Sequence, residues 1–141
     1  MKKFFDSWAE YKENKGETVT AKRMYYKMIS ENENRDDIKI YIMKYKGEIV
    51  SMVGYTLHMN TANQVINMSA SRTTIQHDDE KARKIFFDLT RQMTWFTYLE
   101  LDKMNINYVY CGDGTESKGM AMYKSQCNTE IIEYVKVAPK R

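Results

Sequence analysis

The chain is poor in cysteine, histidine, proline and glycine, and each shortage excludes a class of protein. Two cysteines, Cys111 and Cys127, cannot build a disulfide framework, so we expect reduced thiols in a cytosolic protein. The only histidines, His58 and His77, belong to no metal-ligand motif, so a dedicated metal site is not expected. The single proline, Pro139, and the six glycines form no low-complexity segment.

Long apolar runs and a strong charge of one sign are also missing. No stretch approaches the ~20 apolar residues that a membrane-spanning helix needs, and polar residues follow Lys2 and Lys3 too soon for a signal peptide. The net charge of +3 helps an anionic ligand to approach, but it is too small for a dedicated nucleic-acid-binding surface. We therefore expect a soluble cytoplasmic protein with no membrane partner.

The chain does have enough apolar side chains for a folded core. It is 141 residues long and 43% hydrophobic, which argues against disorder and predicts a single domain over residues 1–141.

Two amphipathic helices are predicted near the start of the chain. Aromatic residues recur at helical spacing over residues 3–14, and Gly16 ends this first helix. Thr18 or Thr20 is expected to cap a second helix. Its apolar stripe consists of Ala21, Met24, Tyr25, Met28 and Ile29.

Three strands are predicted next, as an antiparallel meander. Residues 38–45 and 49–59 are rich in strand formers and flank a tight turn at Gly47, which predicts a hairpin. A turn over residues 60–63 leads to a third strand over residues 64–73.

A long helix is expected to begin at His77 or Asp78 and to end at Asn105. Its apolar residues extend well beyond one stripe, so we expect the sheet and then another element or a second subunit to cover it, which allows a homodimer. One face is expected to carry Ala82, Phe86, Leu89, Met93 and Phe96.

The last quarter of the chain reads as strand, glycine-rich turn, short helix and strand. The predicted order is therefore α-α-β-β-β-α-β-α-β, an α/β fold with a mixed sheet, a β-meander, a crossover helix and a C-terminal strand-helix-strand. The residues in question are Tyr108 to Cys111, Gly112 to Gly114, Glu116, Gly119, Tyr123-Lys124 and Glu130 to Val137.

This order resembles the GNAT superfamily of N-acetyltransferases over about residues 18–137. The tail is most similar to that of the Fem-type peptidyltransferases and their small acyltransferase relatives. In that family the fourth and fifth strands of the fold separate to admit the pantetheine arm of an acyl-CoA. The resemblance implies that residues 68–72 here correspond to the family's fourth strand and residues 108–112 to its fifth strand. Free backbone groups on a strand edge bind such an amide-bearing ligand as if it were another strand.

The resemblance also implies an acyl-CoA cosubstrate, acetyl-CoA or another, held by the fourth strand and the start of the long helix. The chain departs from the family pattern here, because the loop RTTIQHDDEKAR has no glycine to wrap the pyrophosphate. Fem-type enzymes share this lack and use aminoacyl-tRNA, which is the alternative donor. The expected cosubstrate-binding residues are Met68, Ser69, Ala70, Ser71, Arg72, Thr73, Thr74, Lys81 and Lys84.

Acyl transfer to an amine needs a base, donors for the oxyanion and an acid for the departing thiolate. By resemblance, Tyr123 matches the tyrosine that serves as the acid, although a tyrosine packed on the core is the plainer interpretation. Asp113 is favoured as the base over His58. The plainer interpretations are that Asp113 is a turn residue and that His58 is a structural histidine. Glu100 and Glu116 are further candidates.

Two other functions stay open at this point. A compact GNAT-like enzyme of Mom type would acylate a nucleobase and bind nucleic acid. A non-catalytic GNAT-like module, for example a phage-encoded inhibitor, would explain the missing glycine loop and the broadly apolar helix.

Overall fold

The computed structural model describes residues 1–69 and 80–111, except the side chains of residues 80–83 and 87. The chain divides into two compact units, Met1–Tyr110 and Cys111–Arg141, and all the elements below belong to the first. The single domain over residues 1–141 stays a prediction.

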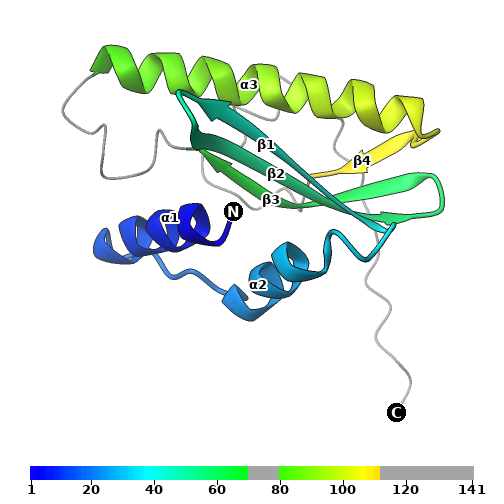
Figure 1. The fold of residues 1–141 in the computed structure, drawn as a ribbon, viewed down its shortest axis with the longest axis horizontal. Helices are drawn as coiled ribbons and strands as arrows, with labels where there is room; N and C mark the ends of the chain where they lie inside the picture. The colour runs from blue at the N-terminus through cyan, green and yellow to red at the C-terminus, as the bar shows by residue number, and fades with distance from the viewer. Residues whose placement is uncertain (70–79, 112–141) are drawn as a thin grey trace, which may run out of the picture. The chain divides into compact units, whose positions relative to one another are not determined.

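The described elements follow the expected order up to the strand that begins at Tyr108, which confirms the α/β prediction with a mixed sheet (Figure 1). The predicted short helix and closing strand lie outside the described residues. The elements are α1 Lys2–Asn14, α2 Lys22–Glu31, β1 Ile38–Tyr45, β2 Glu48–His58, β3 Thr61–Ser69, α3 Glu80–Lys103 and β4 Tyr108–Tyr110.

The predicted threonine cap of α2 is wrong. Ala21 is the N-cap, with a left-handed φ of 59°, and no side chain caps the helix. The carbonyl of Ala21 accepts the first helical bonds, from the N–H groups of Met24 and Tyr25. Thr18 and Thr20 come before this turn, and a capping side chain must stand at the N-cap itself.

The sheet has the order β1-β2-β3-β4, with antiparallel pairs β1–β2 and β2–β3 and a parallel pair β3–β4. The predicted turn over residues 60–63 is wrong, because β3 begins at Thr61. The chain reverses over Met59 and Asn60 alone, with Met59 at a φ of 53°, so that His58 pairs with Thr61. Ala62 is fully buried between the outward Thr61 and Asn63, which is strand periodicity in a polar stretch.

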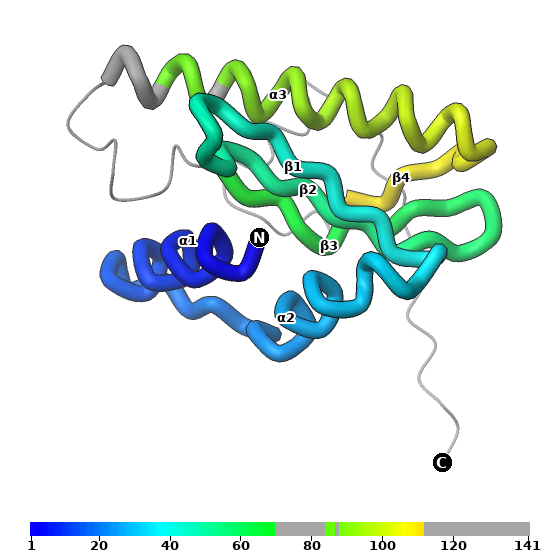
Figure 2. Tube along the Cα trace, in the orientation of Figure 1, coloured from blue at the N-terminus to red at the C-terminus, as the bar shows by residue number. Residues whose placement is uncertain are grey.

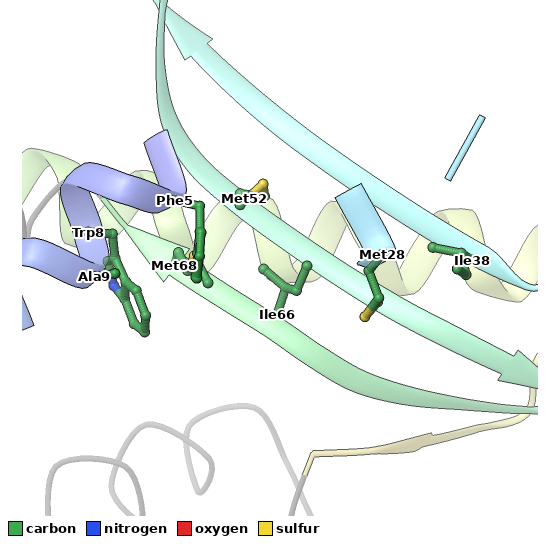
Figure 3. Packing of buried hydrophobic residues seen from close by; sticks show 8 residues of the cluster. All are labelled: Phe5, Trp8, Ala9, Met28, Ile38, Met52, Ile66 and Met68. Carbon is green, nitrogen blue, oxygen red and sulfur yellow. The ribbon is translucent and has the colours of Figure 1, made fainter. Parts of the chain in front are cut away.

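The helices α1 and α2 pack on one face of the sheet (Figure 1). Figure 3 shows Phe5, Trp8 and Ala9 of α1 beside Met68 of β3. The buried cluster on this face consists of Phe5, Trp8, Ala9, Met28, Ile38, Met52, Ile66 and Met68.

The helix α3 covers the other face, where it packs on Val53, Tyr55 and Ala62. Its buried side combines apolar residues with three threonines, which were not predicted to face the core. Among the described side chains of α3, the buried ones are Phe86, Thr90, Met93, Thr94, Thr97 and Leu101.

The outer side of α3 keeps large apolar side chains exposed to solvent. Trp95 is 66% exposed, and Ile85, Phe96 and Leu99 are each about half exposed. The expectation that α3 is covered on more than one side is therefore not met by the described part of the chain, and a homodimer through this helix stays a prediction. None of the described helices is long and apolar enough to span a membrane.

Candidate functional site

The pairing between β3 and β4 covers only one end of β3. Thr61, Ala62 and Asn63 pair with Tyr108, Val109 and Tyr110, which are the first three of the nine residues of β3 and all of β4 (Figure 2). Beyond Asn63, no strand in residues 1–69 and 80–111 pairs with this side of β3. We call residues Gln64–Asn67, on the side facing away from β2, the open edge of β3.

The closed end is held by hydrogen bonds from the start of β4. The carbonyl of Asn60 accepts bonds from the N–H groups of Asn107, at 2.8 Å, and Tyr108, at 3.2 Å. Asn105, at a φ of 58°, turns the chain from α3 into this approach. The β2–β3 turn therefore anchors the beginning of β4 next to Thr61.

A β-bulge lies where the open edge begins. Gly54 pairs with Ile66 and Tyr55 pairs with Gln64, so Val65 is an extra residue in β3. A bulge bends its strand and increases the local twist. We infer that this bend directs β3 away from the line of β4 just after their last shared pair, Asn63 and Tyr110.

Glycine at position 54 leaves room for the side chain of Ile66, its partner in β3. A Cβ atom built on Gly54 would lie 2.9 Å from Cδ1, 3.0 Å from Cβ and 3.1 Å from Cγ1 of Ile66. The Ile66 side chain therefore fills the space that any other residue at position 54 would need.

The side chain of Ser51 shows which backbone groups face the open edge. Its Oγ donates a hydrogen bond to the carbonyl of Met68 at 3.3 Å, so this carbonyl points toward β2. Because residues along a strand alternate between their two neighbours, the N–H and C=O groups of Asn67 point the other way, toward the open edge. These are the groups that an added strand or an extended amide ligand would pair with.

Buried hydroxyl groups form a seam between α3 and the sheet. The phenol of Tyr55 lies 2.7 Å from the hydroxyl of Thr97 and accepts a bond from the side-chain amide of Gln64 at 3.3 Å. Nearer the beginning of the helix, the hydroxyl groups of Thr90 and Ser69 lie 2.7 Å apart and are hydrogen-bonded. The seam therefore runs beside β3 from the start of its open edge to its last residue.

Three of the nine predicted cosubstrate-binding residues have described side chains. Met68 is 2% exposed, its side chain packs in the α1 cluster, and its carbonyl points toward β2 and not toward the open edge. Ser69 is buried and bonded to Thr90, and Lys84 is exposed near the beginning of α3. Lys81 belongs to α3, but its side chain is not described; Ala70, Ser71, Arg72, Thr73 and Thr74 lie outside the described residues.

Among the candidate acid and base residues, only His58 and Glu100 are described. His58 is exposed at the end of β2, opposite Thr61, and about 10 Å of strand separates Thr61 from Gln64. The structure therefore places His58 at the closed end of the β3–β4 pair and not on the open edge. Glu100 forms a surface ion pair with Lys103 at 2.6 Å, as its solvated interpretation predicts. Tyr123, Asp113 and Glu116 lie outside the described residues.

Two further groups bear on the chemistry of this region. The buried environment of Tyr41 and the charge of Glu100 raise the pKa of the Tyr41 phenol, which disfavours its anionic form. Cys111 follows β4 directly and is half-buried. No cluster of three or more histidine, cysteine or acidic side chains that could bind a metal occurs in the described ranges.

Reasoning from the sequence missed Gln64, Tyr55 and the three buried threonines. Thr90, Thr94 and Thr97 recur at i, i+4 and i+7, the spacing of one helix face. That spacing was the available signal, but a search for apolar periodicity does not count threonine.

No protein-family model and no curated protein matches the chain. Solved structures do share its fold. An aminoglycoside 6'-N-acetyltransferase from Acinetobacter haemolyticus, solved without ligand, superposes with a TM-score of 0.61 at 7% identity, over 100% of this chain and 95% of that one. An aminoglycoside acetyltransferase from an uncultured soil metagenomic sample, solved with trehalose, gives 0.56 at 10% identity, over 97% and 86%. This chain therefore shares the fold of these two acetyltransferases, as the predicted α/β order expects, whereas the Fem-type likeness of its tail stays a prediction.

Proposed function

We propose that this protein is an acyltransferase that moves an acyl group from acyl-CoA to an amine. The observation that carries the proposal is the short pairing of β3 with β4, which ends at Asn63 and Tyr110 and leaves the open edge beside it. The two acetyltransferases of similar fold support the general class of reaction.

The open edge suits the pantetheine arm of an acyl-CoA. This arm is extended and carries two amide groups, so it can pair with the outward N–H and C=O groups of Asn67 as an added strand would. The bulge at Val65 comes just after the last β3–β4 pair, and the start of β4 is bonded to Asn60 at the other end of that pairing. Lys84 is an exposed cation near the beginning of α3, where the phosphates would bind with Arg72 and Lys81.

In the proposed reaction, the amine nitrogen bonds to the thioester carbon, and the carbon–sulfur bond breaks. The amine loses a proton to a base, and the departing thiolate gains one from an acid. Tyr123 as the acid and Asp113 as the base keep these proposed roles, which rest on their positions in the sequence. His58 is the weaker candidate for the base, because it lies at the closed end of the β3–β4 pair.

The acceptor is a primary amine of a small molecule, a protein or a nucleobase. The names of the two solved relatives make an aminoglycoside the first acceptor to assay. A polyamine, a peptide amine and duplex DNA complete the panel. Binding to DNA would have to weaken steeply with salt to support the nucleobase.

The donor is tested by thermal unfolding with and without acyl-CoA. A ligand at 100 times its Kd stabilises the folded state by about 2.7 kcal/mol, which is roughly 9 °C in Tm for a chain of this length. Acetyl-CoA, longer acyl-CoAs and free CoA should each raise Tm. Release of free thiol from acetyl-CoA on addition of an amine then measures transfer.

Two substitutions at Asn67 test the open edge itself. Asn67→Pro removes the N–H that faces the open edge and no bond of the β2–β3 ladder, so the fold should survive and the shift with acyl-CoA should be lost. Asn67→Ala keeps the N–H and should keep the shift. Equal shifts in both variants, or no shift of the unchanged protein with any acyl-CoA, would refute the proposed donor site.

A further inference from the structure

Gln64 stands at the point where β3 and β4 stop pairing. It is the first residue of β3 after the last pair, Asn63 and Tyr110, and the bulge at Val65 follows it. Its side chain is half-buried and donates a hydrogen bond from Nε2 to the phenol of Tyr55 at 3.3 Å. Tyr55 itself is fully buried beneath α3.

The hydrogen bonds around Tyr55 fix the orientation of this amide. The hydroxyl of Thr97 donates to the carbonyl of Thr94 at 2.8 Å, since a carbonyl can only accept. Its single proton is then used, so the 2.7 Å bond between Thr97 and Tyr55 requires Tyr55 to donate. Tyr55 thereby uses its own proton and can only accept from Gln64. The NH₂ group of Gln64 must therefore face Tyr55.

The opposite end of the amide is consequently an acceptor. With Nε2 directed at Tyr55, Oε1 of Gln64 points away from the phenol, and no donor among the described residues bonds to it. A glutamine carbonyl accepts N–H or O–H groups and cannot donate. Tyr55 already has a hydrogen-bond partner in Thr97, so the phenol does not need Gln64 as a second partner. Holding the long side chain of Gln64 in one rotamer costs conformational entropy, so the fold alone does not explain why it is held there.

We propose that Gln64 is a ligand-binding residue whose Oε1 accepts a hydrogen bond from an N–H group at the vertex of the β3–β4 pair. Tyr55 and Thr97 are positioning residues that hold the amide in this orientation. The inference rests on the proposed function, in which two N–H groups reach this vertex. One is the amine of the acceptor, and the other is the pantetheine amide nearest the thioester.

The first test compares Gln64→Met with Gln64→Glu. Methionine has nearly the same length but no acceptor oxygen, so the affected ligand should bind about 5- to 100-fold more weakly, with Tm nearly unchanged. Glutamate keeps an acceptor and should restore much of the binding. If the N–H belongs to the amine, KM for the amine rises and Kd for acyl-CoA does not change. If it belongs to pantetheine, Kd for acyl-CoA rises.

The second test acts through Thr97, which is buried beneath α3 and reaches Gln64 only through Tyr55. Thr97→Val removes the acceptor for the Tyr55 proton, so the phenol no longer fixes which end of the Gln64 amide faces the ligand. Binding should fall as in Gln64→Met. Thr97→Ser keeps the hydroxyl and should behave as the unchanged protein. A merely structural threonine would give parallel losses of Tm and no selective change in KM or Kd.

The outcomes separate the two proposals. An active protein in which Gln64→Met and Thr97→Val leave KM and Kd unchanged overturns the role of Gln64 and leaves the acyltransferase in place. Losses of binding that only follow losses of Tm also overturn that role. An unchanged protein that neither binds any acyl-CoA nor transfers an acyl group overturns both.

Discussion

Replacing Gly54 by alanine should destabilise the protein, because the new methyl group would enter the space of Ile66. The three contacts of 2.9–3.1 Å involve Cδ1, Cβ and Cγ1 of Ile66, and the Cβ atom cannot move without its backbone. Overpacking of this kind costs ~1–3 kcal/mol. Alanine in a strand recovers about 0.5–1 kcal/mol relative to glycine. Because the Cβ atom of Ile66 cannot yield, we take the middle to upper part of the first range, about 2–3 kcal/mol, which leaves a net loss of about 1–2 kcal/mol.

The loss can be measured by thermal or urea unfolding. The entropy of unfolding for 141 residues is about 0.3 kcal/mol/K, so Tm should fall by roughly 3–7 °C. Ile66→Val removes Cδ1, so Gly54→Ala should lower the free energy of unfolding less in the Ile66→Val protein than in the unchanged chain. The difference between the two losses, the coupling energy, should be about 0.5 kcal/mol or more. A Gly54→Ala protein as stable as the unchanged chain, or costs that simply add, would refute the packing argument.

Three further predictions concern the first unit. Burial, and to a smaller extent the charge of Glu100, raise the pKa of the Tyr41 phenol, so its contribution to stability is full below pH 10 and is lost as pH rises through the folded-state pKa. Tyr41→Phe should therefore reduce the fall of the urea midpoint above pH 10. An unchanged dependence of the midpoint on pH would contradict this. Hydrogen bonding to Arg35 lowers the pKa of Asp37, so Arg35→Gln should raise it in an NMR titration; no movement would mean that the ion pair does not form in solution. Trp95→Ser should leave Tm within about 2 °C in the monomer, because the side chain is largely exposed. Light scattering that reveals a dimer in the unchanged protein and its loss in this variant would establish an interface on α3.

The strands were predictable where their apolar residues alternate or cluster, as in β1 and β2. The start of β3 was not, because Thr61 and Asn63 resemble turn residues until the buried Ala62 between them is known. The register carries information that composition lacks: the bulge at Val65 depends on how β3 pairs with Gly54 and Tyr55.

The candidate site was predictable only as a region. The separation of two neighbouring strands followed from the resemblance, and the short pairing of β3 with β4 agrees with it. The resemblance implied Met68 as part of the binding strand but did not say which residues of that strand face the ligand. Residues alternate, and the bond from Ser51 shows that Met68 faces β2 and Asn67 the open edge. Gln64 was missed because its orientation depends on Tyr55 and Thr97, which lie far from it in the sequence.

Amide hydrogen exchange at Asn67, followed by NMR with and without acetyl-CoA, tests the open edge most directly. The N–H of Met68 belongs to the β2–β3 ladder and should be protected in both states, which makes it the internal reference. We expect the N–H of Asn67 to exchange rapidly in the free protein and to slow at least tenfold when acetyl-CoA is saturating. An exchange rate at Asn67 that is unchanged by saturating acetyl-CoA would contradict strand-like binding of the donor at this edge.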